Sequence, residues 1–185
     1  KKKQKIFVKK MYKFLFFSRI DEKKNLLETI NFFKKIKKNF LFEIFGPSKN
    51  KKYLKTCLNA IKNDPRIKFK GKITFEKLIK ISNNYDFFIL LSKNENFGHS
   101  ILEASSLNIP VIISKNNPWA KDEDLKKLIT VLDLKFGKKA LEDLSNIVNL
   151  SKKNYKKLMI NNKKFFINVL NQNNFEKNRY FELFS

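Results

Sequence analysis

Two carboxylates and a glycine lie close together in residues 92–104. Glu95 precedes Gly98 in a polar loop, and Glu103 follows eight residues after Glu95, in a segment with the spacing of a helix packed on a sheet. A loop that leads into a helix presents unpaired backbone N–H groups and the positive end of the helix dipole, which together bind anions. The stretch therefore predicts a site in which loop amides hold a phosphate and the two carboxylates hold the hydroxyls of a sugar or a ribose.

Two cations follow an earlier apolar run. Residues 14–17 are typical of a buried strand, and apolar residues at helical spacing over 26–36 predict the helix after it. Arg19 and Lys24 lie between the two, at the carboxyl end of the strand, where parallel sheets bind ligands. The guanidinium group is a fixed fork of donors that suits a phosphate. The alternative is a solvated turn in a lysine-rich chain.

The elements that must position these groups alternate along the chain. Six short apolar runs predict strands at 14–17, 40–45, 67–69, 87–91, 111–114 and 129–132. Helical spacing predicts helices at 26–36, 53–61, 74–81, from 101 onward, and at 138–150, 152–170 and 175–184. This alternation predicts an α/β fold: a parallel sheet of about six strands with helices on both faces and extra helices at the carboxyl end. Thr74 is expected to cap its helix, and Asp86 to hold a turn.

The residues around Gly98 resemble a known signature. Glu95 and Glu103 enclose Phe97-Gly98, and Pro110-Val111-Ile112 and then Pro118-Trp119 follow. This combination resembles the donor site of retaining glycosyltransferases of the GT-B type, and in particular the family 4 enzymes that build bacterial surface polysaccharides. The resemblance implies that the chain is the C-terminal, donor-binding half of a GT-B fold, which is a Rossmann-like, doubly wound domain.

The same resemblance implies transfer of a sugar from a nucleotide-diphosphate sugar to an acceptor glycan or lipid-linked glycan. Arg19 and Lys24 match the spacing of an Arg-x4-Lys motif that holds the donor diphosphate, so they would neutralise charge on the leaving phosphate. Glu95 would position the transferred sugar, and these three residues form the implied catalytic set. The implied donor-binding residues are Arg19, Lys24, Gly46, Gly71, Glu95, Asn96, Phe97, Gly98, His99, Ser100 and Glu103. The resemblance implies no metal and no cofactor besides the donor.

Three positions depart from the family pattern or allow two interpretations. Gly46 precedes Pro47, where relatives have a second glycine. Asn108 replaces a glycine, but asparagine tolerates the left-handed conformation, so the turn is expected to persist. Trp119 either covers the nucleotide or seals the edge of the sheet.

Three other features attract chemical interpretations. His99 is interpreted as a spacer or a phosphate hydrogen-bond partner and not as a catalytic base. The acidic run at 122–124 could bind a metal, but GT-B enzymes neutralise phosphates with Arg and Lys, so we predict a helix N-terminus there. Cys57 lies in an apolar helical pattern and is expected in the core.

The domain plan follows from these elements and the resemblance. Residues 1–12 are predicted to be a basic lead-in, 13–150 the nucleotide-sugar-binding domain, and 151–185 helices that pack toward an N-terminal GT-B domain. That domain is missing from this sequence, so the isolated half is expected to bind donor without transferring sugar. A non-catalytic or truncated module that binds a nucleotide sugar or another anion is the alternative.

The net charge of +24 has two explanations. One is a compositional bias toward Lys and Asn, and the other is a phosphate-rich substrate or an anionic membrane surface. Nucleic acid is not an expected partner, because no motif of the common nucleic-acid modules is present. No apolar run approaches the roughly 18 residues of a membrane span. We expect a cytoplasmic protein, with peripheral contact at the inner face of the cell membrane left open.

Overall fold

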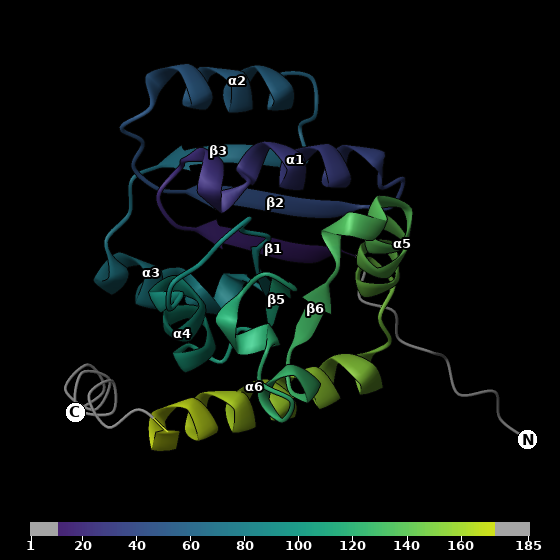
Figure 1. Cartoon of the computed structure of the whole chain (residues 1–185). Helices are drawn as coiled ribbons and strands as arrows, with labels where there is room; N and C mark the ends of the chain where they lie inside the picture. The colour runs from purple at the N-terminus through teal and green to yellow at the C-terminus, as the bar shows by residue number, and fades with distance from the viewer. Residues whose placement is uncertain (1–10, 173–185) are drawn as a thin grey trace, which may run out of the picture.

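Six apolar segments pair side by side into one parallel sheet in the computed structural model, which describes residues 11–172 (Figure 1). The strands are β1 (Tyr12–Phe17), β2 (Phe40–Phe45), β3 (Ile67–Gly71), β4 (Phe87–Leu90), β5 (Val111–Ser114) and β6 (Thr130–Leu132). Their order is β3-β2-β1-β4-β5-β6, and every adjacent pair is parallel. The predicted α/β class and the six strands are confirmed.

Helices connect the strands and flank the sheet (Figure 1). The α-helices are α1 (Leu26–Lys35), α2 (Lys51–Ile61), α3 (Phe75–Ile81), α4 (His99–Ser106), α5 (Gly137–Val148) and α6 (Lys152–Gln172). Short 3-10 turns are η1 (Glu22–Lys24), η2 (Ser82–Asn84), η3 (Pro118–Ala120), η4 (Leu125–Lys127) and η5 (Leu134–Phe136). Within residues 11–172, no helix has the length and apolar character needed to cross a bilayer.

The strand order reverses at β1, which pairs with β2 on one side and β4 on the other. The chain therefore leaves β1 and β4 toward opposite halves of the sheet, and a crevice forms at their carboxyl ends. Both strands are fixed by burial, since Phe14, Phe87 and Phe88 are completely enclosed. The residues that follow β1 and β4 are thus held at a rigid edge of the sheet.

Local polar contacts explain several element boundaries. Thr74 caps α3 by accepting a hydrogen bond from the N–H of Lys77, as predicted. Asp86 Oδ2 accepts the N–H of Lys13 at 2.9 Å, and the N–H of Asp86 donates to the Lys13 carbonyl at 2.8 Å. Asp86 therefore ties the start of β4 to β1, in the structural role that was predicted. Asn108 has a φ of 57°, so the left-handed turn predicted before β5 is also present.

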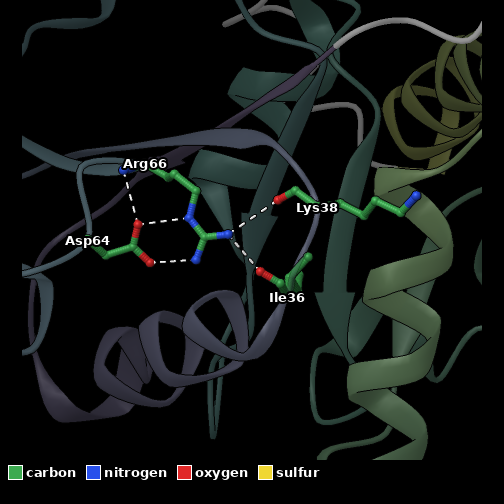
Figure 2. A network of polar contacts seen from close by, with 4 residues as sticks. All are labelled: Ile36, Lys38, Asp64 and Arg66. Carbon is green, nitrogen blue, oxygen red and sulfur yellow. Dashed lines mark hydrogen bonds and ion pairs between the residues drawn. The ribbon is translucent and has the colours of Figure 1, made fainter.

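The turn before β3 depends on Asp64 and Arg66 (Figure 2). The Arg66 guanidinium donates to both Asp64 oxygens, at 2.8 and 2.7 Å, and to the carbonyls of Ile36 and Lys38 at 2.7 and 3.3 Å. It also lies 4.4 Å from the centre of the Phe40 ring. Hydrogen bonds from Arg66 hold the pKa of Asp64 below its usual range. The pair joins the loop after α1 to the turn before β3.

Some predicted boundaries differ from the structure. Helix α2 begins at Lys51, where the side chain of Asn50 caps it, and not at 53. The acidic run at 122–124 leads into only one 3-10 turn, η4, in place of a regular helix. The predicted helix at 175–184 and nearly all of the basic lead-in lie outside the described residues.

Candidate functional site

A cavity of about 590 Å³ opens at the carboxyl ends of β1 and β4. It brings together the loop after β1, the loop after β4 and the first turn of α4. Nine of the residues predicted for the site line it: Arg19, Lys24, Glu95, Asn96, Phe97, Gly98, His99, Ser100 and Glu103. Its other residues were not predicted for the site; they are Phe17, Ser18, Asp21, Lys23, Pro47, Ile73 and Asn94. Several of these are immediate neighbours of Arg19 and Glu95, and that adjacency was the available signal.

Gly98 forms the turn that starts α4. Its φ of 88° is left-handed, a conformation that favours glycine, and it is the N-cap residue of the helix. A β-carbon here would lie 2.9 Å from Cδ1 of Ile101 and 3.4 Å from Cγ of Glu95. No side chain caps the helix at this residue. The first-turn amides and the positive end of the helix dipole therefore act on the cavity beside Gly98.

Lys24 and Glu95 form an ion pair across the cavity wall. Lys24 Nζ lies 2.5 Å from Glu95 Oε2, and the two side chains are only 11% and 9% exposed. The backbone of Lys24 is fixed as well, because its N–H donates to Oδ1 of Asp21 at 3.0 Å. Lys24 therefore presents a buried, positioned ammonium group whose partner is a carboxylate predicted for the same site.

Backbone contacts join the two loops that carry this pair. The N–H of Lys93 donates to the carbonyl of Lys23 at 2.8 Å, and Nδ2 of Asn25 donates to the carbonyl of Leu91 at 3.1 Å. Asn25 itself has a φ of 56°, a conformation that asparagine tolerates. The loop after β1 and the loop after β4 therefore form one connected wall.

The remaining predicted groups are more accessible. The side chains of Arg19 and His99 are exposed, and those of Ser100 and Glu103 are half-buried. The His99 ring centre lies 4.8 Å from that of Phe97, in a tilted arrangement. Arg19 is thus open to a ligand, while the Lys24 ammonium lies deeper in the wall.

Comparison with known families classifies this arrangement. The family described as Glycosyl transferases group 1 matches residues 1–131 of the 185. The chain belongs to the group 1 glycosyl transferases. A search of curated proteins found no match.

Solved structures share the fold of this glycosyl transferase domain. The C-terminal domain of a group 1 family protein (LpcC) from Francisella tularensis matches with a TM-score of 0.68 at 20% identity, over 85% of each chain. A glycosyltransferase from Rickettsia africae matches with a TM-score of 0.67 at 17% identity, over 96% of this chain and 49% of that one. Anabaena Alr3699/HepE, solved in complex with UDP and glucose, matches with a TM-score of 0.68 at 18% identity, over 91% of this chain and 48% of that one. The chain thus has the fold of the C-terminal half of a GT-B glycosyltransferase, and it spans about half the length of the two longer enzymes.

Two glycines predicted for the donor site of this glycosyl transferase domain do not line the cavity. The nearby cavity residues are Pro47 and Ile73. Gly46 is required for packing, because a β-carbon there would lie 1.8 Å from the carbonyl oxygen of Ser18. Its N–H donates to the carbonyl of Gly71 at 2.9 Å, and Gly71 has a φ of 80°. The structure thus explains Gly46 by the close approach of two chain segments.

Trp119 lies behind the Gly98 loop of the glycosyl transferase domain. The indole ring is buried and meets Phe97 edge-to-face, with ring centres 4.9 Å apart, and Phe165 of α6 at 6.2 Å. Trp119 is not among the cavity residues. The sequence left open whether Trp119 covers the nucleotide or seals the edge of the sheet, and the structure instead packs it between the Gly98 loop and α6.

Other residues with possible chemistry have structural partners. Asp122 Oδ1 accepts the N–H groups of Asp124 and Leu125, both at 2.9 Å. Glu123 and Asp124 form exposed ion pairs with lysines one helical turn away. Across the described part of the chain, no group of three or more His, Cys, Asp or Glu side chains is arranged to hold a metal ion. Cys57 is in the core, as predicted, and burial raises the pKa of its thiol to about 11.

Proposed function

We propose that this chain is the donor-binding half of a retaining, family 4 glycosyltransferase. It binds a nucleotide-diphosphate sugar, and the whole enzyme transfers that sugar to an acceptor glycan or lipid-linked glycan in the synthesis of a bacterial surface polysaccharide. The observation that carries the proposal is that Arg19, Lys24, Glu95 and Glu103 line one cavity together with the first turn of α4.

The diphosphate is assigned to the wall formed by Arg19, Lys24 and the turn at Gly98. Two cations from the loop after β1 line the same cavity as the first turn of α4, so a bound anion lies within reach of both elements. Charge-assisted hydrogen bonds from guanidinium, ammonium and backbone amides are the strong contacts available to phosphate oxygens. In this proposal Asn96, Phe97, His99 and Ser100 shape the wall around the phosphates.

The carboxylates are assigned to hydroxyl groups of the donor. Glu103 lies one turn into α4, where it can accept hydrogen bonds from ribose or sugar hydroxyls. Glu95 lies on the opposite loop, beside the transferred sugar in this assignment. A carboxylate accepts two hydroxyls without rearrangement, which suits positioning of a sugar ring.

Arg19 and Lys24 supply the electrostatic part of the mechanism. As the bond between the sugar and the diphosphate breaks, negative charge grows on the leaving phosphate, and fixed cations at that position stabilise the transition state. We propose that these two cations serve in place of a metal ion.

The acceptor site belongs to the N-terminal GT-B domain in this proposal. Catalysis needs the acceptor held at near-attack distance from the sugar, and that positioning accounts for several kcal/mol of the barrier. We therefore propose that residues 1–185 bind donor but do not transfer sugar alone.

Peripheral contact with an anionic membrane from the cytoplasmic side is part of the same proposal. Helix α6 contains six lysines and no acidic residue. On its exposed side, Ile160 and Ile167 are 59% and 45% exposed. Lysines near an anionic leaflet attract the surface, and exposed apolar side chains add contact with it.

A transfer assay with radiolabelled nucleotide sugars and a mixed acceptor extract tests whether residues 1–185 need an N-terminal GT-B domain to transfer sugar. The expected result is no transfer by residues 1–185, and transfer once an N-terminal GT-B domain is joined to them. Robust transfer by the 185-residue chain alone would show that it builds its own acceptor site and would overturn this part of the proposal.

A further inference from the structure

The ion pair between Lys24 and Glu95 is more buried than an ordinary surface pair. Its side chains are 11% and 9% exposed, whereas the arginine of the Asp64–Arg66 pair is 27% exposed. The two charges belong to residues 71 positions apart, on different loops of the same cavity. A separation of 2.5 Å makes this a direct, charge-assisted hydrogen bond.

The backbone around the pair is held in place, so only the two side chains can exchange hydrogen-bond partners. Asp21 fixes the N–H of Lys24, and the Lys93-to-Lys23 hydrogen bond joins the loops beside it. The loops therefore keep the ammonium and the carboxylate within reach of each other. A lysine side chain has four rotatable bonds, so its ammonium can move to a new acceptor while the backbone stays in place.

The cavity wall carries equal numbers of positively and negatively charged side chains. Three cationic side chains line it, Arg19, Lys23 and Lys24, together with three carboxylates, Asp21, Glu95 and Glu103. An incoming diphosphate adds negative charge to a wall that is already neutral, so it competes with the wall carboxylates for the nearby cations. Lys24 is the cation that the structure shows bound to a carboxylate predicted for the donor site.

We infer that Glu95 and a bound diphosphate compete for the Lys24 ammonium. The inference rests on the proposed function for the identity of the ligand as a nucleotide-diphosphate sugar. When such a donor binds, Lys24 moves to a phosphate oxygen, and the sugar hydroxyls supply new hydrogen-bond donors to Glu95. A nucleoside diphosphate without its sugar takes Lys24 but leaves Glu95 with no replacement donor.

This competition makes the site selective for the intact donor over the spent nucleotide. An unpaired carboxylate in a mostly buried position is costly, and that cost falls only on a ligand that lacks the sugar. Release of the nucleoside diphosphate after transfer is then favoured, since the Lys24–Glu95 pair re-forms as it leaves.

Titration of the 185-residue chain with inorganic pyrophosphate, followed by calorimetry, tests the competition without a base or a sugar. Glu95→Gln releases Lys24, so pyrophosphate should bind about tenfold more tightly than to the wild type, the scale of one charge-assisted hydrogen bond. Glu103→Gln removes the same charge from the same wall and should improve binding by at most about threefold, through long-range electrostatics alone. The tenfold gain in pyrophosphate affinity should be absent from the double variant Lys24→Gln/Glu95→Gln. Melting curves recorded for each variant confirm that it is folded.

Three results would overturn the inference. The first is an unchanged pyrophosphate affinity in Glu95→Gln, and the second is an equal increase of that affinity in Glu103→Gln. The third is an increase that persists in the double variant Lys24→Gln/Glu95→Gln. Titration with UDP, GDP and ADP sugars in parallel separates the inference from the proposed function. Nucleotide-sugar binding without a pyrophosphate gain rejects only the competition, whereas a pyrophosphate gain without any nucleotide-sugar binding rejects only the identity of the donor.

Discussion

Replacing Gly98 with alanine tests whether the turn before α4 is held as the structure shows. Its left-handed backbone costs an alanine about 1–2 kcal/mol. The added β-carbon would also lie 2.9 Å from Cδ1 of Ile101, so that buried side chain must leave its preferred rotamer at about 0.5–1.5 kcal/mol. We expect Gly98→Ala to lower the free energy of unfolding by about 1.5–3.5 kcal/mol, which corresponds to a fall in Tm of about 3–14 °C.

Gly71 provides a matched control for this change. It has a similar φ, 80° against 88°, but a β-carbon at Gly71 would meet no atom within 4 Å. Gly71→Ala should therefore show only the backbone cost of about 1–2 kcal/mol. Gly71 does not line the cavity, so its replacement should leave pyrophosphate binding unchanged, whereas Gly98→Ala should weaken that binding about tenfold by turning the helix amides away.

Urea unfolding at equilibrium and calorimetric titration measure the two quantities on the same samples. Gly98→Ala should lower both the free energy of unfolding and the affinity for pyrophosphate by more than Gly71→Ala does. Equal losses of stability would refute the close packing of Gly98 against Ile101, and unchanged pyrophosphate binding in Gly98→Ala would refute the assignment of the α4 terminus to a phosphate.

Three further predictions concern other parts of the chain. Asp64→Asn should lower the free energy of unfolding at pH 7 by about 1.5–3 kcal/mol, because Arg66 loses its charged acceptor (Figure 2). The pKa of Asp64 is depressed in the folded state, so its stabilisation is fully present above the unfolded-state value near 3.9 and is lost as pH falls through the lower folded-state value. In urea titrations the wild type and Asp64→Asn should therefore begin to converge as pH falls below about 4. Cys57, with its raised pKa and buried position, should react with iodoacetamide at pH 8 only at the rate of unfolding, and fast labelling of the native chain would contradict its placement in the core. Membrane contact can be tested by sedimentation with phosphatidylglycerol vesicles. The α6 variant Lys156→Gln/Lys157→Gln/Lys164→Gln should lose most of its vesicle binding, whereas the α2 variant Lys51→Gln/Lys52→Gln/Lys55→Gln, with the same change in charge, should retain it. Equal losses of vesicle binding in the two variants would indicate attraction by overall charge alone.

The centre of the sheet could be predicted because β4 and β5 are short apolar runs that are buried at every position. The strands that contain Phe87 and Ile112 show no alternation of apolar and polar residues, which is typical of strands buried on both faces. The predicted positions of Arg19 and Gly98 followed from the strands, because each lies in the loop that follows one of them, β1 for Arg19 and β4 for Gly98. Parallel strands place all such loops at one edge, so their convergence needed no knowledge of side-chain contacts.

Contacts between distant residues could not be predicted in the same way. The Lys24–Glu95 pair joins positions 71 residues apart. The spacing from Arg19 indicated Lys24, but nothing in the sequence around Lys24 indicated Glu95 as its partner. Gly46 matched a family glycine by position, yet its packing against Ser18 appears only when β1 and β2 are placed side by side. The role of Trp119 depended likewise on α6, whose Phe165 lies against it.

A calorimetric screen of UDP, GDP and ADP sugars with the 185-residue chain shows whether its cavity is a donor site. Saturable binding of at least one nucleotide sugar is the expected result. Glu103→Gln should weaken that binding by about 1.5–3 kcal/mol, the scale of one charged hydrogen bond, with no change in the melting curve. Absence of binding for every nucleotide sugar, or an affinity that Glu103→Gln does not change, would contradict the assignment of this cavity as a donor site.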